Sequence, residues 1–234
     1  MKRKYRPTGL SLVSLKRMAE RSIHMMVSGN WASVPKDLLS YLEEEVGGDP
    51  AENPVATAFS LIRIGVSPEK AVALLDWKKF EDLCVQGLQI SGMDTISRVR
   101  FSLRGRRFEV DVLGLNEGLV LVVDCKMWSK GSHPKASKLK EAAHKQLERV
   151  RALDEALRKG GVKRLEVIEG KSVMVPTLVT WLDFGIRLSD EGVPIVPLLS
   201  LPSFLDQVYE LIDDLAHLKI DYRVKIRVRD RSQP

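Results

Sequence analysis

The chain has 234 residues, with 37 Lys and Arg against 31 Asp and Glu and a formal net charge of +6. No apolar stretch approaches the ~18 residues needed to span a membrane, and no signal peptide follows the basic start. We therefore expect a cytoplasmic protein without a membrane partner. Cys84 and Cys125 lie far apart in the sequence and form no C-x-x-C, which indicates neither a zinc site nor a disulfide framework.

The first 75 residues predict an all-helical region. Apolar residues recur at helical spacing over residues 10–26, 35–46 and 53–64, and Ser67-Pro68-Glu69 has the form of a further helix start. These segments carry apolar stripes but no catalytic constellation. We interpret residues 1–75 as a helical region for substrate binding or dimerisation, and residues 76–234 as a separate domain.

That domain opens with a helix and three strands. Residues 76–90 carry an apolar stripe at helical spacing, and residues 98–104 alternate apolar side chains with arginines. Two further strand-like runs, residues 107–113 and 119–126, are joined by the turn-type sequence of residues 114–118. A connection of this length favours antiparallel pairing of the two runs.

Charged side chains interrupt the last two strands. Apolar residues occupy one face of residues 107–113, with Phe108, Val110 and Val112 in line, which leaves Asp111 on the other face. In the next strand Asp124 and Lys126 share a face, whereas Cys125 points to the opposite, apolar side. Charged groups in core-type strands cost several kcal/mol unless they are paired or bind a metal.

Antiparallel pairing would bring Asp111 within reach of Asp124. Two carboxylates about 4 Å apart repel each other by roughly 4 kcal/mol at an effective dielectric constant of 20, so they would bind a divalent cation or share a proton. Hard oxygen ligands favour Mg²⁺ or Mn²⁺. The two strands therefore predict a metal site.

At these residues the chain resembles the PD-(D/E)XK nuclease superfamily, which has the restriction-endonuclease-like fold and includes Mrr-type enzymes and archaeal Holliday-junction resolvases. The match consists of Val110-Asp111 and, thirteen positions on, Asp124-Cys125-Lys126. Val110 replaces the proline of the family name, and the second acid is Asp rather than the commoner Glu, but neither change removes a ligand. The resemblance implies an α/β fold with an αβββαβ core and a central mixed sheet flanked by helices, over about residues 76–217.

The resemblance also implies further members of the site. Glu81 is similar to the acid that the family places on its first core helix, where it would hold the metal or its water. Asp82 is the alternative for this role, and a solvated helix carboxylate is the other interpretation of Glu81. The backbone carbonyl of Cys125 would provide one more metal ligand.

Residues 136–159 predict a long helix closed by Gly160-Gly161. Gln146 is the one polar side chain on its apolar seam, and related nucleases often place a glutamine near the metal on this helix. Buried polar groups are hydrogen-bonded, so we expect Gln146 to meet the site carboxylates or Lys126. The other interpretation is a glutamine at the edge of the seam that faces water.

The remaining elements complete the expected core. Residues 172–185 and 192–199 are β-rich apolar runs, and residues 201–217 predict a helix that Ser203 could cap. After this core, residues 222–229 alternate apolar with basic side chains and predict an amphipathic strand with one basic face.

Basic residues flank the acidic pair in the sequence, as expected of a protein whose phosphate contacts supply non-specific affinity for nucleic acid. For the lysines and arginines of the helix over residues 136–159, a solvated helix face is the alternative. We expect DNA rather than RNA as the partner. The expected nucleic-acid-binding residues are Arg98, Arg100, Arg104, Arg106, Lys130 and Lys135.

The resulting hypothesis is a Mg²⁺- or Mn²⁺-dependent endonuclease that hydrolyses DNA. A homodimer is one of the assemblies that we expect for it. Asp111 and Asp124 would bind the metal, and Lys126 would orient the attacking water or stabilise the transition state. Two readings compete with it: a catalytically inactive nucleic-acid- or protein-binding module with the nuclease fold, and a structural ion-pair cluster of Lys126 with the two aspartates. The sequence leaves open the substrate structure, its specificity and the oligomeric state.

Overall fold

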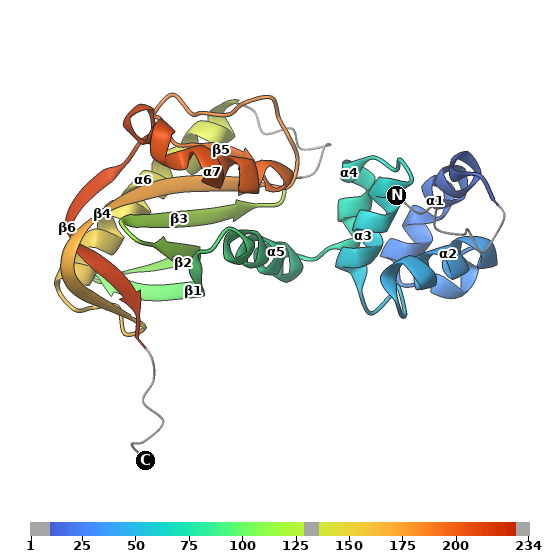
Figure 1. Cartoon of the computed structure of the whole chain (residues 1–234), viewed down its shortest axis with the longest axis horizontal. Helices are drawn as coiled ribbons and strands as arrows, with labels where there is room; N and C mark the ends of the chain where they lie inside the picture. The colour runs from blue at the N-terminus through green and yellow to red at the C-terminus, as the bar shows by residue number, and fades with distance from the viewer. Residues whose placement is uncertain (1–9, 129–135, 228–234) are drawn as a thin grey trace, which may run out of the picture. The chain divides into compact units, whose positions relative to one another are not determined.

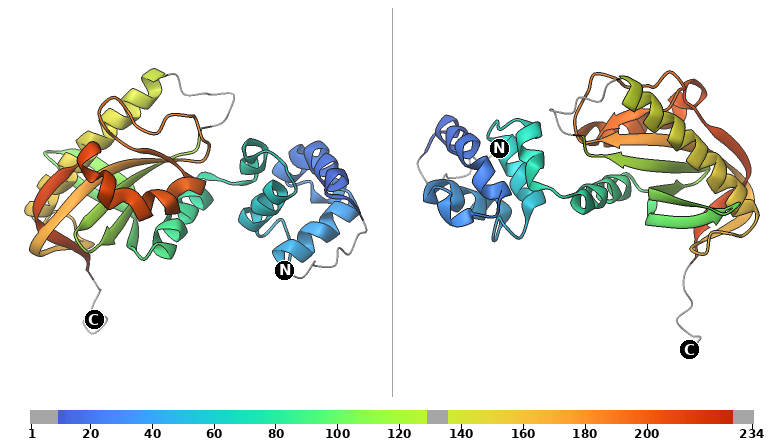
Figure 2. Two further views of the ribbon diagram at one scale, coloured as in Figure 1. Left: turned by 45° about the horizontal axis from the view of Figure 1, so that its top comes forward. Right: turned by 180° about the vertical axis from the view of Figure 1, so that it is seen from behind.

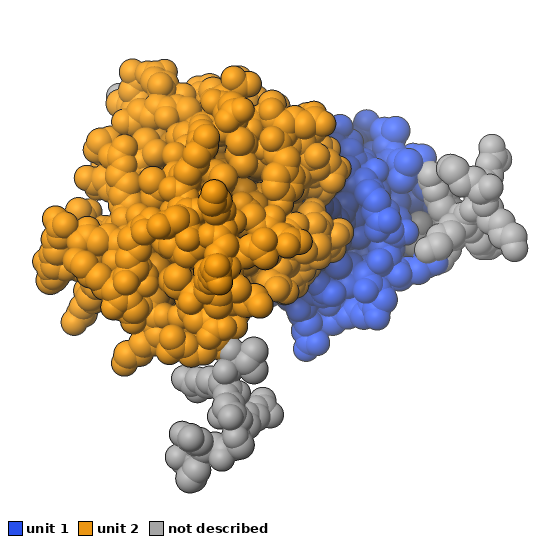
Figure 3. Space-filling view, turned by 60° about the vertical axis from the view of Figure 1, so that its left-hand side comes forward, with its two compact units in different colours: residues 1–79 blue, residues 80–234 orange. Residues whose placement is uncertain are grey.

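The computed structural model describes residues 10–128 and 136–227. The chain divides into two compact units, Met1–Lys79 and Phe80–Pro234, which Figure 3 shows in blue and orange. The boundary falls within the first turn of a helix, and each unit has a core of its own.

The first unit is helical, and Leu15, Leu38 and Leu61 are fully buried in its core. Its first helix is capped by the hydroxyl of Ser11, which accepts a hydrogen bond from the backbone N–H of Ser14 at 3.2 Å. The predicted start at Pro68 is correct, although the helix that follows is only one turn long. The helices are α1 (Leu12–Val27), α2 (Lys36–Val46), α3 (Pro54–Arg63) and α4 (Pro68–Ala71).

In its described residues, the second unit has a six-stranded sheet and three α-helices, which Figure 1 labels. Its elements in chain order are α5 (Trp77–Ile90), β1 (Asp94–Leu103), β2 (Arg106–Asn116), β3 (Leu119–Lys126), α6 (Ala136–Arg158), β4 (Leu165–Thr180), β5 (Ile195–Pro197), α7 (Leu201–Leu211) and β6 (Leu218–Ile226).

The sheet is mixed. β1, β2 and β3 form an antiparallel meander, β4 runs parallel to β3, and β4 then pairs with β5 in parallel and with β6 antiparallel. The two-residue turn between β2 and β3 uses Gly118 at φ +77°, a conformation that glycine adopts at little cost. The predicted α/β class, with a central mixed sheet between helices, is confirmed.

Helices cover both faces of this curled sheet. In Figures 1 and 2, α6 lies on one face, whereas α5 and α7 lie on the other. Between α6 and the sheet lies a core to which all of β1, β2, β3, β4 and β6 contribute, with Leu113, Leu153 and Met174 fully buried. Burial of this apolar surface, at about 25 cal/mol per Å², fixes α6 against β3 and thereby positions the polar residues of both elements.

The alternation of side chains changes phase within β1 and β2. Ile96 and Val99 both belong to the core under α6, as do Val110 and Leu113. Residues three apart face opposite sides of a regular strand, so each strand must turn over between them. Val112, expected on the same face as Val110, is instead buried outside this cluster.

The change of phase centres on Arg98 and Asp111. The register of β1 and β2 would place these two residues opposite each other, yet the ladder skips this pair. Arg98 has φ +52°, which is uncommon for a residue other than glycine. The irregularity therefore lies next to the predicted metal ligand.

Several expected boundaries need correction. β4 begins at Leu165 rather than at residue 172, because its first half pairs with β6 instead of β3. Ser203 caps no helix, since α7 begins at Leu201 after Ser200. The helix expected to reach residue 217 ends at Leu211 and is followed by a short 3₁₀ turn. β6 then starts at residue 218 and joins the sheet, although sequence reasoning placed it outside the core.

In the described part of the chain, no helix combines the length and the apolar character that crossing a bilayer requires.

Candidate active site

The two predicted metal ligands lie on neighbouring strands. The ladder of β2 and β3 ends with the pair of Val112 and Val123, and the next residues outward are Asp111 and Asp124. In place of a further backbone pair, Oδ2 of Asp111 accepts a hydrogen bond from the backbone N–H of Cys125 at 2.8 Å. The side chain of Asp111 thus crosses to β3 directly beside Asp124.

Asp124 is 3% exposed and contacts two cations. Its Oδ2 lies 2.6 Å from Nζ of Lys126, and its Oδ1 lies 3.1 Å from Nη1 of Arg149 on α6. Sequence reasoning missed Arg149. It stands three positions after Gln146, a spacing that places both side chains on one helix face, and this was the signal that could have identified it.

Gln146 is fully buried, but its partners differ from those expected. Its side-chain amide donates to the backbone carbonyl of Val122 at 2.6 Å, and its carbonyl oxygen accepts from the guanidinium of Arg149. The expected contacts with the carboxylates or Lys126 are therefore wrong, because α6 directs this residue at the backbone of β3. Gln146 reaches Asp124 only through Arg149.

Burial and charge act together on Asp111. Burial, followed by the negative charge of Asp124, raises the pKa of Asp111 from 3.8 to about 6, against the opposing effects of the Cys125 N–H, Arg149 and Lys126. Around neutral pH the two aspartates and two cations sum to zero net charge. The arrangement is thus a compact, nearly balanced charge cluster at one end of β3.

Glu81, the residue expected as a third acid, forms an ion pair with Arg98 of β1. Its side chain is buried, and its Oε2 accepts hydrogen bonds from Nε and Nη2 of Arg98, both at 2.9 Å. Two predicted functional residues, one assigned to metal and one to nucleic acid, therefore neutralise each other. Asp82, the alternative acid, is exposed on α5. Over residues 10–128 and 136–227, no three His, Cys, Asp or Glu side chains gather in a group that could hold a metal ion.

The other arginines predicted to bind nucleic acid are exposed and form ion pairs with acids of the same unit. Arg106 also lies over the ring of Phe108, 4.9 Å from its centroid. Lys130 and Lys135 lie outside the described residues. The pairs are Arg100 with Glu109 at 2.9 Å, Arg104 with Glu155 at 2.9 Å and Arg106 with Glu148 at 3.7 Å.

The two cysteines meet on the face of β3 that α5 covers. Cys84 and Cys125 are both buried free thiols, and the hydrogen bond between them together with burial raises the pKa of the Cys125 thiol. Their distance in the sequence is thus no guide to their distance in the fold. Cys125 lies between Asp124 and Lys126 in the sequence, and its side chain points to the other face of β3. Its contact with Cys84 therefore holds the central residue of the D-x-K segment on the face opposite Asp124.

The donors at the site suit a hard divalent cation only in part. Asp111 and Asp124 provide carboxylate oxygens of the kind that Mg²⁺ prefers. Both oxygens of Asp124 already face cations, so an ion bound there would compete with Lys126 for Oδ2. The two carboxylates and the Cys125 carbonyl would hold such an ion, and Lys126 would lose its contact with Oδ2.

No family model matches the chain, and no curated protein is significantly similar to it in sequence. Two solved structures show a weak likeness. AF1548, a protein of unknown function, is 16% identical over 42% of this chain and 46% of its own, with a TM-score of 0.27. VC1899 from Vibrio cholerae is 15% identical over 87% of this chain and 51% of its own, with a TM-score of 0.33. The chain spans about half the length of each protein, and TM-scores this low carry no argument about function.

Proposed function

We propose that the protein is a Mg²⁺- or Mn²⁺-dependent nuclease with a restriction-endonuclease-like core, acting on DNA. The observation that carries the proposal is the placement of Asp111 beside Asp124, with Lys126 at 2.6 Å from Asp124, at the end of paired strands. The order α5, β1, β2, β3, α6, β4 supports it, because it follows the αβββαβ sequence of elements that the resemblance implies.

The charges of the site suit a phosphodiester once a divalent ion is bound. The four groups Asp111, Asp124, Lys126 and Arg149 are together neutral, so a divalent ion would give the site a net charge of about +2. When bound, such an ion lowers the pKa of a coordinated water toward neutrality and neutralises charge on the phosphate. The site with its ion would then attract an anionic substrate, whereas the site without an ion attracts neither anions nor cations strongly.

Each protein side chain has a distinct part in this proposal. Asp111 and Asp124 hold the ion, and Lys126 donates hydrogen bonds to the attacking water or to a phosphate oxygen. Arg149 fixes the orientation of Asp124 and offsets part of its charge, while Gln146 holds Arg149 in place. Arg149 and Gln146 are therefore positioning residues.

A second candidate rests on the same contacts. Both carboxylate oxygens of Asp124 are engaged by Lys126 and Arg149, as in a purely structural ion-pair cluster. In that case the unit would be a binding module that keeps the fold without turnover. A buried pair of this kind stabilises little compared with an apolar replacement, so stability alone gives weak reason for its presence.

The test is incubation of the full chain with supercoiled plasmid, branched DNA, linear duplex, single strands and RNA, each with Mg²⁺, with Mn²⁺ and with EDTA. The proposal predicts metal-dependent cleavage of at least one DNA substrate. If the protein binds these nucleic acids but cleaves none of them, the inactive binding module is favoured.

A further inference from the structure

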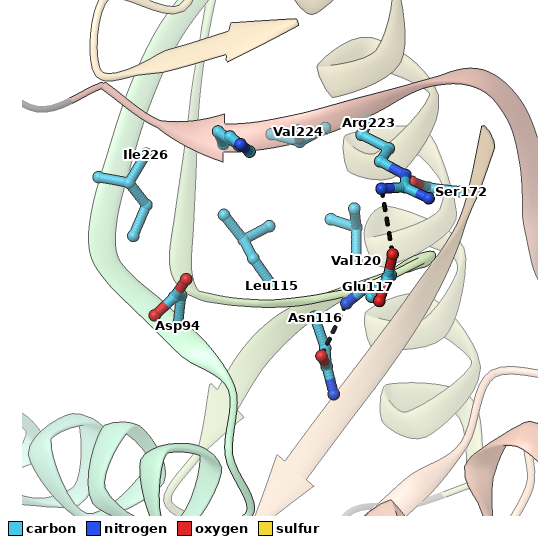
Figure 4. Close-up of a pocket in the computed structure, with 10 residues that line it drawn as sticks. Asp94, Leu115, Asn116, Glu117, Val120, Ser172, Arg223, Val224 and Ile226 are labelled. Atoms are coloured by element: carbon cyan, nitrogen blue, oxygen red, sulfur yellow. Dashed lines mark hydrogen bonds and ion pairs between the residues drawn. The ribbon is translucent and has the colours of Figure 1, made fainter. Parts of the chain in front are cut away.

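Two adjoining hollows lie between β1 and β6, at the opposite end of β3 from Asp124. One has a volume of about 580 Å³, and Figure 4 shows that it is bounded by Arg223 and Val224 of β6 and by the turn between β2 and β3. The other, of about 460 Å³, lies beside the start of β4. Ile226 lines both, and we name the two hollows together the β6 groove.

Cations dominate the rim of the β6 groove. Arg223 pairs with Glu117 at 3.2 Å, and Arg164 donates to the backbone carbonyl of Ser97 at 2.9 Å. The other three cations are exposed and form no ion pair within the described part of the chain: Lys163, Lys225 and Arg227.

Acids are fewer in the groove and lie mainly at one end. Asp94 and Glu117 line the larger hollow, whereas the smaller hollow contains no acid among its described lining residues. Glu166 is the cross-strand neighbour of Lys225, but the two form no ion pair. Ile96 and Ile226 are the apolar lining residues of the smaller hollow. A lining that combines cations with apolar residues suits a sugar–phosphate backbone, which presents charged phosphates and less polar sugars.

A lining residue of the groove and a residue of the candidate active site lie four positions apart on β3. Val120 lines the groove, and Asp124 follows four residues later, with both side chains directed to the α6 side. Four residues of strand span about 13 Å, which corresponds to roughly four base-pair steps of a duplex. The core under α6 fills the face between them, so a duplex that runs past α6 from the candidate active site would have backbone within about this distance of the groove.

We propose that the β6 groove binds the phosphate backbone of double-stranded DNA, as a contact separate from the cleavage centre. This deepens the proposed function by assigning a duplex substrate that extends past the two aspartates. It needs no turnover, since phosphate contacts are made without metal. The groove supplies affinity without reading sequence, because backbone contacts carry no direct sequence information.

The competing account concerns the position of β6 at the edge of the sheet. Lysines and arginines on an edge strand prevent its unpaired backbone groups from pairing with other chains. In that case removal of the cations would promote association of the protein and leave DNA affinity unchanged. Binding to an anionic membrane surface is the other alternative.

The test compares variants of the full chain by fluorescence anisotropy with a labelled duplex of about 30 base pairs in EDTA. The test variant combines Lys163→Gln, Lys225→Gln and Arg227→Gln. A matched pair on one strand compares Lys225→Gln with Lys219→Gln, since Lys219 is an exposed cation of β6 that lines neither hollow. Circular dichroism verifies that each variant is folded, and gel filtration reports whether it associates.

We expect the triple variant to bind the duplex about tenfold or more weakly, and the slope of log affinity against log salt to fall by about 2 to 3, because roughly 0.9 counterions are released per phosphate contact. Lys225→Gln should weaken binding, whereas Lys219→Gln should not. Equal affinities and equal salt slopes for the triple variant and the wild type would overturn the proposal. The proposal would also be overturned if the triple variant no longer bound phosphatidylserine vesicles but still bound DNA as the wild type does. Because metal is absent, loss of cleavage activity affects none of these outcomes.

Discussion

Oδ2 of Asp111 accepts a hydrogen bond from the backbone N–H of Cys125 at 2.8 Å, which fixes the carboxylate beside that of Asp124. A single bond thus holds two acids together at the point where the ladder of β2 and β3 ends. Burial and the repulsion between the two carboxylates destabilise the ionised form of Asp111, and its pKa is raised for this reason.

The first prediction concerns pH and stability without metal. Because the pKa of Asp111 rises from 3.8 to about 6 on folding, the folded state binds this proton more tightly than the unfolded chain. The contribution of Asp111 to stability is therefore greatest below pH 3.8 and falls by up to about 3 kcal/mol as the pH rises to 6. Asp111→Asn keeps an acceptor for the Cys125 N–H and removes the charge.

Urea denaturation in EDTA at several pH values between about 4 and 7 measures this effect. The unfolding free energy of Asp111→Asn, relative to the wild type, should increase by up to about 3 kcal/mol across that window. A difference that stays constant with pH would contradict the account of the raised pKa.

A second prediction concerns Arg149. Arg149→Met removes the guanidinium that contacts Asp124 and Gln146, which leaves one oxygen of a buried carboxylate and one buried amide carbonyl without this donor. We expect a loss of about 2 to 4 kcal/mol in the free energy of unfolding. Arg151→Met, at an exposed position on the same helix, should change it by about 0.5 kcal/mol or less. Equal effects of the two substitutions would show that Arg149 is no part of the cluster.

Gln146 gives a third prediction. Gln146→Leu removes the donor to the Val122 carbonyl in a fully buried setting, and should cost about 1 to 3 kcal/mol. Gln89 provides the control, because its amide also donates a hydrogen bond, to Thr95 at 2.9 Å, but in an exposed position. Thermal or urea unfolding of Gln89→Leu should show a change of about 0.5 kcal/mol or less. If Gln146→Leu proved equally mild, the amide would have no structural importance.

Side-chain alternation and turn chemistry were sufficient to predict that Asp111 and Asp124 belong to neighbouring strands, since hairpins obey local rules. The contact between Arg149 and Asp124 depends on how α6 crosses β3, which is set by packing between distant segments. The position of Arg98 at φ +52° follows no sequence rule for arginine, and its ion pair with Glu81 joins two residues that the sequence assigned to separate roles.

The strands that pair late in the chain were harder to predict for a related reason. The first half of β4 contains Glu166 and Glu169, and its polar appearance hides a strand whose partner, β6, begins about 50 residues further on. The first half of β4 becomes recognisable only in the presence of β6. The same pairing creates the β6 groove, which sequence reasoning described only as one basic face of a strand.

The central claim is that Asp111 and Asp124 form a metal-dependent cleavage site, and the rate of Mg²⁺-dependent DNA cleavage by Asp124→Asn tests it most directly. Asn keeps the shape of the side chain and removes the charge, so the account predicts a rate at least about 100-fold lower than wild type. Glu109→Gln, an exposed acid on β2 that pairs with Arg100, is the control and should retain wild-type cleavage. Cleavage by Asp124→Asn at the wild-type rate would contradict the account.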